Sequence, residues 1–140
     1  MKTTIENSKW GVRSASFWMT LLVAAGIIFI GIMFIVSPQA NAVGFGIPFS
    51  SKADIAFGRI KGIRDIFSGL VLLPLLFLGM RRATAWAFTA AIIVPATDCL
   101  IILTTNGTSD IQHLLIHGLT AVYMAVTSFL LFRDKTLKTF

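Results

Sequence analysis

The chain has 140 residues, of which 56% are hydrophobic and only 13% are charged. This balance excludes an ordinary soluble domain and predicts one compact unit that lies mostly in lipid. The net charge of +6 does not indicate nucleic-acid binding, because the basic residues stand at the ends of apolar runs rather than on one amphipathic face. We therefore predict a single all-α integral membrane domain over residues 1–140, located in the cell membrane (the inner membrane of a bacterium, or a plasma membrane).

The first predicted span covers residues 17–36, which hold no charge and are long enough to cross a bilayer. Trp10 and Trp18 stand near its start, where aromatic residues mark a membrane interface. A cleaved signal peptide is the alternative, because residues 40–42 have the small-x-small form of a cleavage site. The apolar run is longer than the roughly 7 to 15 residues of a signal-peptide core, which favours a retained helix.

Pro38 predicts the end of this helix, because proline disfavours a helical residue before it. Residues 39–54 then mix apolar side chains with Gly44, Gly46 and Pro48. This composition predicts an apolar, turn-rich loop that lies on the membrane surface or over the bundle.

The second predicted span, residues 60–80, is the one that carries charge. Its apolar part, residues 66–79, would give only about 21 Å of helix, against a bilayer core of about 30 Å. The helix must therefore extend back through Asp65 and Arg64, which draws ionisable groups to membrane depth. Pro74 predicts a kink in this helix.

The third and fourth predicted spans cover residues 83–105 and 113–132, separated by a polar turn at 106–110. Small residues recur at helical spacing in two of the predicted spans, which allows close approach of a neighbouring helix and predicts self-association through such faces. These residues are Gly58, Gly62 and Gly69 in the second span and Ala83, Ala87 and Ala91 in the third.

Four spans put both termini on one side of the membrane. That side would hold eight of the 12 basic residues. The positive-inside rule then predicts that both termini are cytoplasmic. The basic residues concerned are Lys2, Lys9, Arg13, Arg81, Arg82, Arg133, Lys135 and Lys138.

Ionisable groups from three predicted spans fall at a similar depth in the outer half of the bilayer. They are the candidate ligand-binding residues: Lys61, Arg64, Asp65, Asp98 and His117. Lys61, Arg64, Asp65 and Ser68 also have the spacing of one helix face. We predict that Arg64 and Asp98 form an ion pair across two helices, within reach of His117.

Two plainer interpretations stand beside a binding site. The Arg64–Asp98 pair could serve only as a structural clamp, because charges in lipid are usually paired. His113, His117 and Asp98 have the donor types of a metal site, but two histidines at helical spacing recur by chance, so we predict neither a metal nor a cofactor. Cys99, the sole cysteine, reads as a small packing residue in an apolar run.

The segment KGIRDIFSGL at residues 61–70 carries a family resemblance, together with the earlier SP…GFGIP stretch, VPATDCL and His117. With these motifs the chain resembles the domain-of-unknown-function 4267 family, over roughly residues 17–132. The resemblance implies a four-helix membrane protein with Arg64, Asp65, Asp98 and His117 at the family's polar positions. It implies no activity. A likeness to DoxX-type membrane proteins is architectural only.

Two function classes remain open at this point. The first is a protein that binds or carries a lipid or lipophilic amphiphile in a polar pocket in the outer half of the bilayer, with Arg64 and Lys61 on an anionic head group. The second is an intramembrane enzyme that uses Asp98 and His117 as acid and base on a quinone-like or isoprenoid-like substrate. Polar clusters inside membranes usually mark function, and we favour the binding protein, with membrane lipids as its partners.

Overall fold

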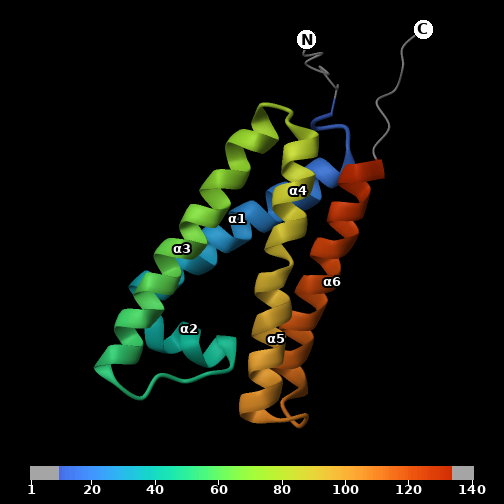
Figure 1. The fold of residues 1–140 in the computed structure, drawn as a ribbon. Coiled ribbons are helices and arrows are strands. Elements are labelled where there is room, and N and C mark those ends of the chain that lie inside the picture. The colour runs from blue at the N-terminus through green and yellow to red at the C-terminus, as the bar shows by residue number, and fades with distance from the viewer. Residues whose placement is uncertain (1–9, 134–140) are drawn as a thin grey trace, which may run out of the picture.

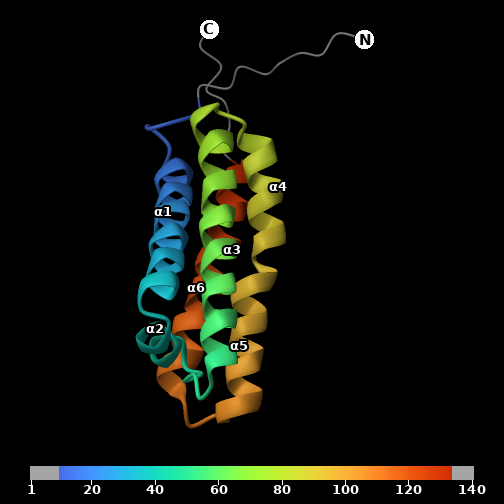
Figure 2. The same cartoon turned by 90° about the vertical axis from the view of Figure 1, so that its left-hand side faces the viewer.

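The computed structural model describes residues 10–133, and these residues fold entirely as helices and short connections. Two of the helices, α4 and α5, follow one another as a single rod, so that four long rods and the short α2 make up the bundle (Figures 1 and 2). The helices are α1 (Ala15–Val36), α2 (Pro38–Phe45), α3 (Lys52–Phe77), α4 (Arg81–Ala91), α5 (Ile93–Asn106) and α6 (Ile111–Arg133).

The helix boundaries follow from local chemistry. Pro38 ends α1 as predicted, and it also begins α2, where its missing N–H costs nothing. Ser51 caps α3: its hydroxyl accepts from the Asp54 N–H, while the Asp54 carboxylate accepts from the Ser51 N–H. Pro95 explains why α4 stops at Ala91, because proline removes the hydrogen bond to the carbonyl four residues earlier and clashes with it.

The segment between the first two long helices differs from the prediction. Residues 39–54 were expected to form a loop, but the first part of this segment belongs to helix α2. The helix ends at Gly46, whose φ of 104° is a left-handed conformation that glycine adopts without strain. Its buried Ala42 belongs to the Ala-Asn-Ala segment considered above as a cleavage site. The short helix lies across one end of the bundle, between α1 and the α5–α6 pair (Figure 1).

Helices α1 and α3 pack closely, because glycines allow their backbones to come into contact. A Cβ atom added at Gly62 would lie 2.5 Å from the Gly31 carbonyl oxygen, and one added at Gly31 would lie 2.5 Å from the Gly62 carbonyl oxygen. Gly69 likewise faces the Ala24 backbone. The close approach predicted for the α3 glycines is therefore present, with α1 as the neighbour.

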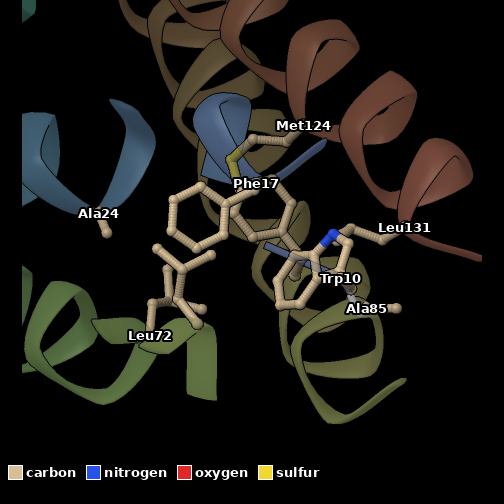
Figure 3. Packing of buried hydrophobic residues seen from close by; sticks show 9 residues of the cluster. Trp10, Phe17, Ala24, Leu72, Ala85, Met124 and Leu131 are labelled. Atoms are coloured by element: carbon tan, nitrogen blue, oxygen red, sulfur yellow. The ribbon is translucent and has the colours of Figure 1, made fainter. Parts of the chain in front are cut away.

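The second half of the chain packs as another pair, with α6 against both α4 and α5. The two pairs join through contacts of α3 with α4 and of α1 with α6. Buried apolar side chains from α1, α3, α4 and α6 meet there, at the end of the bundle that holds the α3–α4 turn (Figure 3). This cluster includes Trp10, Phe17, Leu72, Phe88 and Leu131.

Three of the four predicted spans meet the requirements of a membrane crossing in length and apolar character: Ala15–Val36, Arg81–Asn106 and Ile111–Arg133. Helix α3 has 26 residues and so is long enough, but Lys61, Arg64 and Asp65 interrupt its apolar stretch. Large apolar side chains such as Phe29, Phe67, Leu119 and Phe129 lie exposed along the rods, as expected of surfaces that face lipid. These features indicate a multi-pass membrane protein.

The arrangement of the ends also fits the predicted course of the chain. The start of α1, the α3–α4 turn and the end of α6 lie at one end of the bundle, and the α5–α6 turn lies at the other (Figures 1 and 2). Four of the basic residues that entered the topology prediction, Lys2, Lys9, Lys135 and Lys138, lie outside the described residues.

The glycine contact yields a stability prediction. Gly62→Ala should lower the free energy of unfolding in detergent by about 1–3 kcal/mol, because the new methyl group overlaps the α1 backbone. Gly26→Ala is the matched control, since no atom lies within 4 Å of a Cβ placed there. That change should be neutral or stabilise the helix by up to about 1 kcal/mol. Equal effects of the two changes on the thermal midpoint would contradict the close approach of α1 and α3.

Candidate polar site between the helix pairs

Lys61 and Asp65 form an ion pair on the inner face of α3. They stand four residues apart, which places them one above the other on a helix, and the Lys61 Nζ lies 2.5 Å from the Asp65 Oδ2. Asp65 is buried, and Lys61 keeps 33% of its side chain exposed. The Lys61 ammonium also lies over the rings of Phe34 and Phe45, at 4.6 and 5.3 Å from their centroids. The lysine charge is thus already compensated.

His117 on α6 is fixed by the end of α2. Its Nε2 lies 3.0 Å from the carbonyl oxygen of Phe45, the last residue of that helix. The rings of His117 and Phe45 also meet edge to face, with their centroids 4.6 Å apart. A carbonyl oxygen can only accept, so Nε2 carries the hydrogen. The contact satisfies one of the carbonyls that a helix leaves unpaired at its C-terminus. In the neutral imidazole, Nδ1 is then the free acceptor.

Asp98 on α5 faces that free nitrogen. Its Oδ2 lies 4.0 Å from the His117 Nδ1, too far for a direct hydrogen bond. The Asp98 side chain is 22% exposed, and within residues 10–133 no donor hydrogen-bonds to its carboxylate. Lys61, Asp65 and His117 are the ionisable groups near enough to influence it electrostatically. Asp98 and His117 therefore present two hydrogen-bond acceptors that lie 4.0 Å apart.

A second anchor holds α2 at the α5–α6 turn, outside the apolar stretches. The Asn106 amide donates both to the Gly46 carbonyl oxygen, at 2.8 Å, and to the Asp110 carboxylate. Asp110 also accepts from the His113 Nδ1 at 2.7 Å. These hydrogen bonds, with that from Asn106 the strongest influence, lower the pKa of Asp110 below its ordinary value. The helix end beside His117 is thus held by two side chains from the α5–α6 pair.

Four of the five predicted site residues come together in this way: Lys61, Asp65, Asp98 and His117. We refer to these four side chains as the polar cluster. Arg64 does not join it, because its side chain is exposed. The predicted ion pair between Arg64 and Asp98 is wrong: among the described residues, the basic side chain within 4.0 Å of the Asp98 carboxylate is His117, which is charged only if it is protonated.

The error has a geometric cause. The buried face of α3 repeats at spacings of three and four through Gly58, Gly62, Asp65 and Gly69. Arg64 immediately precedes Asp65, and adjacent helical residues point about 100° apart. Its neighbour Ser68 is also exposed, and the Ser68 hydroxyl donates to the Arg64 backbone carbonyl. Lys61 and Asp65 therefore face the bundle while Arg64 and Ser68 face outward.

The two histidines face different carboxylates. His113 faces Asp110 and His117 faces Asp98. Within residues 10–133, no three side chains of the His, Cys, Asp or Glu type gather where they could hold a metal ion. The Cys99 thiol donates weakly to the Leu114 carbonyl oxygen at 3.6 Å, in keeping with a packing residue.

Sequence reasoning missed the residues that position the cluster. Phe34 and Phe45 read as ordinary apolar side chains, and only the fold brings them against Lys61 and His117. Asn106 lies in a segment with the composition of a turn. Nothing in that segment indicates that its side-chain amide reaches the Gly46 carbonyl, 60 positions earlier. A usable signal was Gly46, since a glycine after a short apolar stretch is typical of a helix C-terminus.

The Lys61–Asp65 pair leads to a testable prediction. Asp65→Asn or Lys61→Met alone should lower the free energy of unfolding in detergent by about 2–3 kcal/mol, because each strands a charge. The loss should stay below that of a fully buried pair, since Lys61 is one-third exposed. The double variant should recover part of the loss. Arg64→Met is the control on the same helix and should shift stability by less than about 0.5 kcal/mol. Thermal unfolding that ranks Arg64→Met with the cluster variants would contradict this assignment.

With the geometry in hand, comparison with known proteins gives one match. Residues 24–131 match the model of the family described as Domain of unknown function (DUF4267), a range that contains all four residues of the polar cluster. No curated protein and no solved structure matches the chain. The match covers more than half of the chain and confirms the resemblance carried by the segment around Arg64 and Asp65. The chain therefore belongs to the DUF4267 family.

Proposed function

We propose that all four long rods cross the membrane and that both termini are cytoplasmic. The pairing of Lys61 with Asp65 supports a crossing by α3, because it neutralises two of the three charged residues in the predicted span 60–80. Arg64 can extend its long side chain toward the membrane surface. The sequence pattern that places eight of the 12 basic residues on one side of a four-span chain supports the orientation.

Cysteine labelling tests this topology. In a Cys99→Ala background, cysteines placed near residue 4, in the Arg81–Arg82 turn and after Lys138 should be protected from an impermeant thiol reagent in intact cells. Ser109→Cys should be labelled. Labelling of the Arg81–Arg82 turn together with position 109 would mean that the second half of the chain does not cross, and the four-span topology would fail.

We further propose that the protein binds or carries a lipid or lipophilic amphiphile whose head group occupies the polar cluster. The observation that carries this proposal is the Asp98 carboxylate, which belongs to a partly buried side chain, 22% exposed, and accepts no hydrogen bond from the described residues. A polar group this deep in an apolar bundle is costly unless a partner satisfies it. The apolar surfaces of the rods offer contact for a tail, and the cluster offers contact for a head.

The geometry of the polar cluster favours other head-group residues than those expected from the sequence. The anionic head expected from the sequence relied on Lys61 and Arg64, but Lys61 is neutralised by Asp65 and Arg64 faces outward. Asp98 and His117 are the members with free hydrogen-bonding atoms. We therefore assign head-group binding to Asp98 and His117, with Lys61 and Asp65 as their neutral surroundings.

An intramembrane enzyme is the second candidate, and one observation favours it. The Phe45 carbonyl fixes the His117 ring and leaves Nδ1 directed at Asp98, which is a suitable arrangement for an acid–base pair. Such a pair could move a proton on a quinone-like or isoprenoid-like substrate.

Self-association stays a prediction. The α3 glycines already face α1, and Ala87 and Ala91 of the other small-residue face pack against the apolar cluster of the bundle.

Lipid mass spectrometry of the gently purified protein tests the binding function. A lipophile should remain with the wild-type protein, and Asp98→Asn should retain at least about tenfold less of it, since a hydrogen bond to a charged group is lost. Arg59→Gln, an exposed change elsewhere on α3, should retain the wild-type amount. Equal retention by all three proteins would contradict binding at the cluster, whereas chemical conversion of an added quinone or isoprenoid would favour the enzyme.

A further inference from the structure

With both of its aspartates ionised, the polar cluster would carry one unbalanced negative charge. It holds one lysine and two aspartates, and the Nε2–H hydrogen bond to Phe45 leaves His117 neutral unless Nδ1 also takes a proton. Lys61 lies on Asp65, so the surplus charge belongs to Asp98. A lone carboxylate in an apolar bundle strongly favours a compensating positive charge. The ligand that suits this cluster is therefore positive.

The free hydrogen-bonding atoms give the same indication. The Asp98 Oδ2 and the His117 Nδ1 are both acceptors, and they lie 4.0 Å apart. One atom with two hydrogens can reach both at ordinary hydrogen-bond lengths of about 2.8–3.0 Å. A hydroxyl has a single hydrogen for two acceptors. A fully ionised phosphate or a carboxylate has none, and it would meet the carboxylates of Asp98 and Asp65.

Resting on the proposed function, we propose that the head group of the bound amphiphile is a cationic amine. Its ammonium nitrogen donates to the Asp98 Oδ2 and to the His117 Nδ1, and its charge balances that of Asp98. The rings of Phe34 and Phe45, which already face the Lys61 ammonium, make the surroundings favourable for a cation. The ligand class is a lipophilic primary or secondary amine.

The test uses the full-length protein in a non-ionic detergent and three probes with the same tail: dodecylamine, dodecanol and dodecyl phosphate. Native mass spectrometry at about pH 8 should show bound dodecylamine in preference to the other two, and Asp98→Asn should weaken its binding by about tenfold or more. Arg59→Gln should bind as wild type.

The outcomes separate this inference from the proposed function. Asp98-dependent binding of dodecanol or dodecyl phosphate, without the amine, would overturn the amine and leave the amphiphile-binding function standing. Amine binding that Asp98→Asn does not weaken, in a variant with a wild-type thermal midpoint, would overturn the site. If no probe binds in an Asp98-dependent way, the proposed function fails as well.

Discussion

The architecture depends on the neutralisation of charge on the inner face of α3. This helix packs between α1 and α4 and brings two ionisable side chains, Lys61 and Asp65, toward the middle of the bundle. Each alone would be an isolated charge away from water, which costs several kcal/mol. Paired with each other, they let α3 bring its glycines against α1. The ion pair and the glycine contact thus together allow a charged helix to pack in an apolar bundle.

Helix α2 fixes the orientation of His117 in the polar cluster. It follows α1 after one residue and crosses the end of the bundle, so that its C-terminal carbonyls face α5 and α6 (Figure 1). His117 and Asn106 donate to those carbonyls, at Phe45 and Gly46. The helix end gains partners for groups that would otherwise lack them, and the His117 ring gains a fixed orientation. That orientation is what directs Nδ1 at Asp98.

The polar cluster contains two pairs with different hydrogen bonding. Lys61 and Asp65 satisfy each other, whereas the Asp98 carboxylate and the His117 Nδ1 lie 4.0 Å apart. Unsatisfied polar groups in an apolar environment are costly. The proposed function therefore rests on the second pair.

The sequence by itself determined the helical class, three apolar spans, the family and the set of ionisable residues, because these follow from local composition and from short motifs. It also determined that the α3 glycines meet a neighbour, since small residues at helical spacing allow close approach. Only the tertiary structure decided which charges face inward. Arg64 and Asp65 are adjacent in the chain, and the direction in which α1 packs on α3 selected Asp65 for the interior. The structure alone also revealed α2 and its link from Phe45 to His117, because a contact across 72 positions depends on how two helix pairs join and leaves no local pattern in the chain.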